Sequence, residues 1–238
     1  MTGTFVNVGA IIVGSLIGLL LKRGIPEKIN NAIIKAMGIA ILVIGLNGVL
    51  TSMLSVGSDG KLESDGALLL LVSLAAGCLI GELLKIEDRL NSLSGVMERK
   101  LKADNLSKGF VTATLVYVIG ALSVVGALND GLLGDHTLLF TKSVLDFISS
   151  IILTAALGIG VIFAAVSVFA VQGSISLLAH VIAPYVSDEL IRLFSMVGYA
   201  LVMALGLNFL VDTKIRVANL LPALAIPVLY YYIFSAFV

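Results

Sequence analysis

An acidic and a basic residue lie one helical turn apart inside an apolar stretch of this chain. Asp146 follows Lys142 by four residues, so in a helix the two side chains lie on one face and can form an ion pair. An ionisable group within a membrane-spanning helix is a functional-site hypothesis by default, because its charge is costly in hydrocarbon. The alternative is a pair near the outer membrane interface, with the lysine reaching toward water. The sequence leaves both interpretations open.

Amide side chains recur at matching places in other apolar stretches. Three asparagines each follow a Gly-Leu or Ala-Leu pair, at nine or ten residues after a glycine. A carboxamide in hydrocarbon normally faces other helices, where it either holds them together or coordinates a ligand. The candidates for a substrate or ion pathway are Asp146, Asn47, Asn129, Asn208, Asn219, Asn7 and Gln172.

Other residue types argue against a metalloenzyme or a hydrolase. His136 and His180 have no ligand residues at zinc-binding spacing. The chain also lacks the Gly-x-Ser-x-Gly, His-Glu-x-x-His and phosphate-loop motifs. Its single cysteine, Cys78, excludes an internal disulfide. We therefore expect no enzymatic activity, no metal and no cofactor.

The composition places these residues in a membrane protein. Hydrophobic residues form 59% of the 238 positions and charged residues only 13%, and the mean hydropathy is +1.11. A bilayer accommodates such a chain as helices, each of about 20 apolar residues. The formal net charge is zero, which gives no indication of a nucleic-acid partner. We expect an all-α integral membrane protein whose main partner is the lipid bilayer.

Eight apolar runs predict about eight transmembrane helices. They cover residues 3–21, 32–54, 66–84, 109–133, 139–157, 159–179, 189–211 and 217–237. The run that contains the charged pair is either a full crossing or a re-entrant segment. Basic residues concentrate in the first, third and seventh loops, so the positive-inside rule places these loops in the cytoplasm. Both termini are then expected outside.

A polar segment, residues 86–108, interrupts the apolar runs. Apolar side chains recur in it at spacings of three and four, with charged side chains between them. This pattern predicts an amphipathic helix on the cytoplasmic face.

Similar glycine patterns predict an internal repeat. Gly14-Ser15-Leu16-Ile17-Gly18 matches Gly77-Cys78-Leu79-Ile80-Gly81, and each precedes a helix that ends in one of the repeated asparagines. The Thr-Lys pair before Asp146 also has a counterpart before Asn219.

We interpret residues 1–238 as a single polytopic membrane domain with a repeated organisation. It consists of a leading helix pair and two three-helix units, at 1–54, 66–157 and 159–237. Because three crossings are an odd number, the second unit is expected to be inverted relative to the first. Inverted repeats are the architecture of many secondary transporters.

Several of these motifs resemble a known family. The opening Gly3-Thr4-Phe5-Val6-Asn7-Val8-Gly9-Ala10, the Gly14-Ser15-Leu16-Ile17-Gly18 motif and the Gly38…Gly45-Leu46-Asn47 run resemble the bacterial integral-membrane family known as domain of unknown function 554. The resemblance covers nearly the full chain. It implies a multi-pass protein of the bacterial cytoplasmic (inner) membrane, and it supplies no catalytic or binding residue.

The expected function is that of a small channel or secondary transporter. The repeat, the matching amides and the carboxylate within a span favour this hypothesis, and we expect the chain to form a homo-oligomer. No basic cluster lies within the spans, so the expected ligand is a monovalent cation or a small polar solute rather than an anion. The alternative is a non-transporting membrane scaffold or regulatory protein that uses residues 86–108 as a docking surface.

Overall fold

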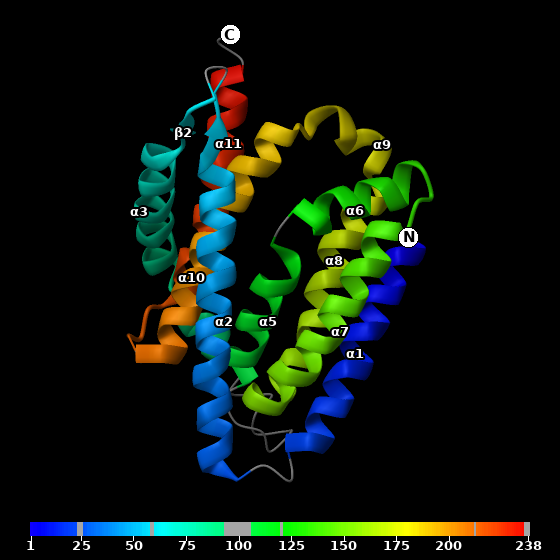
Figure 1. Ribbon diagram of the computed structural model, residues 1–238. Helices are drawn as coiled ribbons and strands as arrows, with labels where there is room; N and C mark the ends of the chain where they lie inside the picture. The colour runs from blue at the N-terminus through cyan, green and yellow to red at the C-terminus, as the bar shows by residue number, and fades with distance from the viewer. Residues whose placement is uncertain (23–25, 58–59, 93–105, 120, 212, 236–238) are drawn as a thin grey trace. The chain divides into compact units, whose positions relative to one another are not determined.

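Helices form most of the computed structural model (Figure 1), which describes residues 1–238 except 23–25, 58–59, 93–105, 120, 212 and 236–238. The first elements are α1 (Thr2–Lys22), α2 (Glu27–Met53), the antiparallel strands β1 (Leu54–Val56) and β2 (Leu62–Ser64), and α3 (Ala67–Leu84). After helical residues 86–92 come α5 (Leu106–Val118), α6 (Ala121–Leu132) and α7 (Thr137–Leu157). The last elements are η1 (Ile159–Phe163), α8 (Ala164–Leu177), α9 (Ala179–Ile182), η2 (Ala183–Tyr185), α10 (Asp188–Val211), η3 (Val217–Leu224) and α11 (Ala225–Ser235).

Glycine and proline determine where several of these helices end. Gly158, with φ of 87°, adopts a backbone conformation that L side chains disfavour, and it separates α7 from η1. This confirms the break expected between the fifth and sixth apolar runs. Pro222 cannot donate the hydrogen bond that an α-helix needs, and the segment around it, η3, is a 3-10 helix.

The predicted spans coincide with helical structure. Six helical segments of the described chain are long and apolar enough to cross a membrane: α1, α2 from Asn31, α3, α7, the run Ile159–Leu177, and α10. The pair α5 and α6, inclined at 62° to each other, provides a seventh crossing if it counts as one span. The eighth predicted run contains the shorter apolar helix Val217–Ile233. The all-α membrane fold is confirmed.

The lengths of two segments bear on the number of crossings. α7 is one continuous helix of 21 residues, which favours a full crossing over a re-entrant segment. η3 and α11 contain 8 and 11 residues. At about 2.0 Å per residue in a 3-10 helix and 1.5 Å in an α-helix, they extend about 32 Å, close to the thickness of the hydrocarbon core. Because a 3-10 helix rises more per residue than an α-helix, η3 and α11 together are long enough to cross the hydrocarbon core despite their few residues.

Internal contacts divide the chain into two compact units. Unit 1 comprises Met1–Ala36 and Leu90–Val186, and unit 2 comprises Met37–Arg89 and Ser187–Val238. These boundaries differ from those of the predicted repeat, because each predicted three-helix unit contributes helices to both compact units. The internal repeat itself stays a prediction.

In unit 1, α1 and α7 lie side by side and run in the same direction (Figure 1). Gly3 contacts Leu139 near the start of both helices, and Gly18 faces Ile151 further along. The chain reverses at η1, so that α8 runs opposite to α1 and α7. α1 and α7 therefore run in one direction and α8 in the other, as the order of the predicted membrane spans requires.

In unit 2, glycines of α2 and α3 allow close helix packing. Gly38 faces Phe209 and Gly48 faces Tyr199, so α2 and α10 are antiparallel. Gly77 lies against η3. A polar residue is not needed to bring these helices together, because small residues allow the backbones to approach.

Candidate functional site

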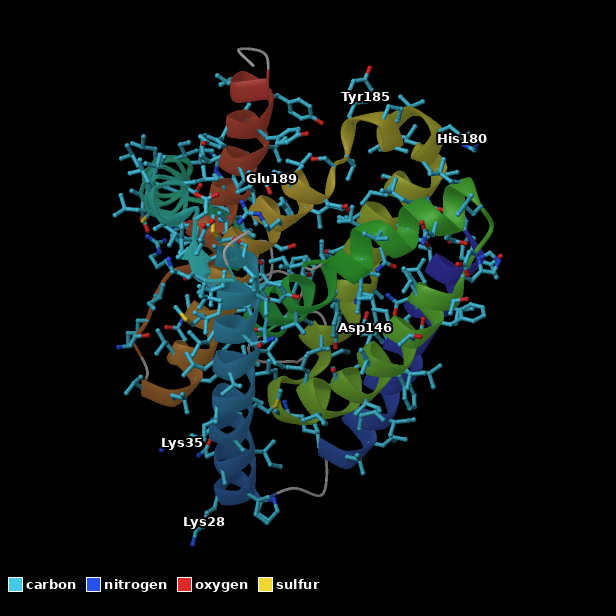
Figure 2. All side chains as sticks on the ribbon, turned by 45° about the horizontal axis from the view of Figure 1, so that its top comes forward. Lys28, Lys35, Asp146, His180, Tyr185 and Glu189 are labelled. Carbon is cyan, nitrogen blue, oxygen red and sulfur yellow. The ribbon has the colours of Figure 1, made fainter. Side chains whose placement is uncertain are left out.

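One buried face of α7 carries the charged pair. Residues on this face recur every three or four positions and therefore lie along one side of the helix. They are Leu139, Lys142, Ser143, Asp146, Ser150, Leu153 and Thr154. Figure 2 shows Asp146 among the helices of unit 1.

Lys142 and Asp146 form a buried ion pair. Lys142 Nζ lies 2.5 Å from Asp146 Oδ2, and the two side chains are 7% and 8% exposed. The pairing allowed by the four-residue spacing is therefore present. The lysine is buried against the carboxylate and does not reach toward water, as it would in the interfacial alternative. Two charges can be buried together only when their attraction and their hydrogen bonds offset the loss of hydration.

Amides from α1 and α8 complete the polar cluster around this pair. Asn7 Nδ2 donates a hydrogen bond of 3.2 Å to Gln172 Oε1, and both side chains are fully buried. The side chain of Asn7 also lies beside Asp146. Three of the seven candidate residues, from three different helices, therefore meet in unit 1. We call Asn7, Lys142, Asp146 and Gln172 the polar cluster.

A tyrosine from α5 lies beside the polar cluster. Lys142 Nζ is 5.9 Å from the centroid of the Tyr117 ring, within the range of a cation–π interaction. Tyr117 Oη lies 2.8 Å from Ser150 Oγ on α7. Both side chains are fully buried. The ammonium group thus has a carboxylate as its charged partner and an aromatic ring nearby.

Glycines on α1 position Asn7 close to α7. A methyl group at Gly14 would lie 2.5 Å from the carbonyl oxygen of Phe147, and one at Gly18 would lie 2.5 Å from that of Ile151. Only a residue without a side chain fits so close to another backbone. The Gly14–Gly18 motif therefore serves helix packing, and this packing holds α1 against the helix that carries Asp146.

Some buried polar atoms of unit 1 have no hydrogen-bond partner among the described residues. Two belong to the polar cluster, the acceptor Oδ1 of Asn7 and the donor Nε2 of Gln172. Hydroxyl oxygens of the same unit share this property: Thr4, Ser15, Thr112, Thr154 and Ser176. Most buried polar groups in proteins are hydrogen-bonded. These atoms can therefore serve a polar ligand or water inside unit 1.

The remaining candidate asparagines have other surroundings. Asn208 binds the turn after α10, with hydrogen bonds to Thr213 and to both backbone groups of Ile215 at 2.7–2.8 Å. Asn129 is half-buried near the end of α6, and Asn47 is exposed on α2. The contacts of Asn208 are those of a structural cap. Whether these asparagines line a pathway stays a prediction.

Asn219, the last candidate, belongs to a polar network of unit 2. Its Nδ2 donates to Glu82 Oε1 and its Oδ1 accepts from the backbone N–H of Glu87, each at 2.7 Å. Arg216 pairs with Glu82 at 2.8 Å and also with Asp88. Partial burial raises the pKa of Glu87.

This network bears on the polar segment 86–108. Helical residues 86–92 begin at the network, and Glu87 and Asp88 attach them to η3. Residues 93–105 lie outside the described residues, so the amphipathic helix expected over 86–108 is seen only in its first turns. The docking role proposed for it stays a prediction.

Sequence reasoning missed Asp130 as a buried charge. It lies in the last turn of α6 with 3% exposure. Its carboxylate accepts the backbone N–H groups of Gly3 and Thr4 at 3.4 Å and lies 2.5 Å from His136 Nδ1. A negative charge at the N-terminus of α1 is favourable for the helix. Two of its partners are backbone groups on a distant helix, which no sequence pattern indicates.

The polar cluster offers oxygen ligands and one neutralised charge pair. Among the described residues, no three His, Cys, Asp or Glu side chains are grouped to hold a metal ion. A carboxylate with nearby amide oxygens is suited to a monovalent cation, and an amide pair with one acceptor and one donor is suited to a small polar solute. The site therefore has binding chemistry.

Comparisons with known proteins agree with the membrane fold. A family model described as "Protein of unknown function (DUF554)" matches residues 2–232. The chain is 37% identical to the "Uncharacterized membrane protein YdfK" of Bacillus subtilis (strain 168), over 100% of this chain and 98% of that protein. It is 28% identical to the "Uncharacterized protein YqgA" of Escherichia coli (strain K12), over 93% and 92%. No solved structure matches.

Proposed function

We propose, from the premise that this chain belongs to the DUF554 family of membrane proteins, that it transports a monovalent cation or a small polar solute through unit 1. The polar cluster is the proposed binding site. The proposed location is the bacterial cytoplasmic membrane, and the proposed activity involves no catalytic step.

The buried Lys142–Asp146 pair is the observation that carries this proposal. Charged residues inside membrane helices are rare, and they mark substrate or ion pathways. A buried ion pair also contributes little to stability, because apolar residues of similar volume can often replace it without lowering the free energy of unfolding. A role in function explains why α7 carries two charges on the face that packs against other helices.

The chemistry of the polar cluster limits the class of ligand. Apart from Lys142, which is neutralised by Asp146 at 2.5 Å, the cluster presents amide groups. An anion would meet the Asp146 carboxylate and find no unpaired positive charge there. A cation meets oxygen atoms, and a neutral polar solute meets both the acceptor of Asn7 and the donor of Gln172. The site therefore favours these two classes.

Flux measurements in proteoliposomes test the proposal. The purified protein is reconstituted, and uptake of Na⁺, K⁺, Li⁺ and a panel of small neutral solutes is compared with that of empty vesicles. The expected result is protein-dependent uptake of at least one of them. Its absence, with the protein shown to be folded and inserted, would contradict the proposal.

A double variant tests whether the polar cluster is the site. Lys142→Met/Asp146→Asn removes both charges together, which avoids leaving one buried charge unpaired. We expect it to fold and to lose uptake. Lys35→Met and Asp188→Asn are matched controls, because both residues are exposed, and uptake should be unchanged in each. Full uptake by the double variant would place the site elsewhere.

A further inference from the structure

The polar cluster holds one positive and one negative charge, and the described residues around it add no other. Lys142 and Asp146 lie on α7, α1 and α8 contribute the neutral amides of Asn7 and Gln172, and α5 contributes the phenol of Tyr117. Tyr117 is the third titratable group that faces the pair in the described part of the chain. The cluster is therefore electrically neutral when lysine is protonated and tyrosine is not ionised.

A cation that binds Asp146 must compete with the lysine ammonium. Lys142 Nζ lies 2.5 Å from Asp146 Oδ2, where a bound cation would also need to be. If the ammonium kept its proton, the cluster would carry a net positive charge in a medium with little water to stabilise it. If the ammonium lost its proton, the charge of the cluster would stay zero.

We infer that Asp146 accepts one positive charge at a time, so that binding of one monovalent cation releases one proton from Lys142. The inference rests on the proposed function and specifies its coupling. An N–H bond of the ammonium breaks, its electron pair stays on the amine nitrogen, and the proton passes to water. The cation takes the place of the ammonium at the carboxylate, and its release allows the amine to take up a proton again.

The available ligands and the charge balance define the class of cation. Asn7 lies beside Asp146, and its Oδ1, in a fully buried side chain, has no partner among the described residues. Oxygen atoms of this kind replace the hydration shell of alkali cations. A divalent ion would leave a net positive charge even after Lys142 had lost its proton. The inferred ligand is therefore a monovalent alkali cation.

Proton release on cation binding tests the exchange without any transport measurement. The full-length protein in detergent, in weakly buffered solution with a pH indicator, is titrated with the chlorides of Na⁺, K⁺ and Li⁺. N-methylglucamine chloride is the control for ionic strength. The expected result is saturable release of about one proton per protein with at least one alkali cation. Saturable cation binding with no proton release would overturn the inference.

Variants at position 142 separate the role of the proton from that of the charge. Lys142→Arg keeps a positive charge that cannot be given up, because arginine stays protonated in proteins, so both cation binding and proton release should be lost. Lys142→Met removes the competing charge, so cation binding should persist. Thermal unfolding shows which variants are folded, and Lys35→Arg and Lys35→Met are the exposed controls. Saturable cation binding with normal proton release by folded Lys142→Arg would overturn the inference.

Failure of the exchange and failure of transport give different results. Uptake of a cation into proteoliposomes without counter-movement of protons would leave the proposed function in place and refute the exchange. Lack of uptake of any cation or solute, together with lack of cation binding in detergent, would refute both.

Discussion

Replacement of Gly14 by alanine should separate α1 from α7 and loosen the contact that holds Asn7 beside Asp146. A Cβ atom at position 14 would lie 2.5 Å from the carbonyl oxygen of Phe147, whereas ordinary contacts begin at 3.4 Å. The two helices must therefore move apart by about 0.9 Å, the difference between these distances. The obstacle is backbone, which cannot rotate away as the end of a side chain can.

The expected loss of stability follows from two opposing effects. Overpacking of a tight contact costs about 1–3 kcal/mol, and a helical alanine gains up to about 1 kcal/mol over glycine. The net destabilisation should be about 0–2 kcal/mol. Gly9→Ala, on the same helix, is the matched control, because a Cβ atom at position 9 meets nothing within 4 Å. It should be neutral or slightly stabilising.

Unfolding of both variants in detergent, followed by circular dichroism, measures the difference. Uptake by the same preparations in proteoliposomes shows whether the displacement reaches the polar cluster. We expect Gly14→Ala to be less stable than Gly9→Ala and to have lower uptake. Equal stability and equal uptake in the two variants would refute the proposed packing of α1 on α7.

Further predictions concern charges and caps. Lys142→Met and Asp146→Asn should each lower the free energy of unfolding by about 3–5 kcal/mol, and the double variant should recover most of this loss; additive losses would argue against a coupled pair. Burial raises the pKa of the Glu87 carboxyl. The protonated carboxyl therefore stabilises the folded state below its ordinary pKa, and this stabilisation is lost as the pH rises through the raised pKa. Glu87→Gln should therefore have a higher unfolding midpoint than the parent protein at pH 7 but not at pH 4, and the reverse order would contradict the assignment. Asn208→Ala should lower the free energy of unfolding by about 1–3 kcal/mol, because the cap is lost, and it should leave uptake unchanged. Loss of uptake in a stable variant would instead identify Asn208 as part of a pathway.

The sequence predicted the helices well because their lengths follow from the thickness of the membrane. The run 139–157 and the helix Thr137–Leu157 differ by two residues at one end. The last span was harder, because Pro222 changes the local geometry to a 3-10 helix. A hydropathy pattern reports apolar length in residues and does not report the rise per residue.

The polar cluster could be predicted only in part. The Lys142–Asp146 pair follows from a spacing of four residues along one helix, which is a local property. The contact between Asn7 and Gln172 joins residues 165 positions apart, so it depends on how α1 and α8 pack. Both amides were candidates from the sequence, but their contact with each other could not be predicted from it.

Matching motifs proved less informative about roles than about packing. Asn208 was a candidate for the pathway on the strength of its repeated spacing. In the structure its side chain binds the turn that follows it, including Thr213 five residues later. A short-range partner of this kind is a signal for a cap, because asparagine often bonds to nearby backbone groups.

Infrared difference spectroscopy of Asp146 tests the central claim most directly. Spectra of the purified protein with and without the transported cation report changes in carboxylate stretching bands. We predict a cation-dependent carboxylate change that is present in the parent protein and in the control Asp188→Asn and is absent from folded Asp146→Asn. An identical difference spectrum in folded Asp146→Asn, or the lack of any carboxylate change in protein that takes up the cation, would contradict the assignment of the site to the polar cluster.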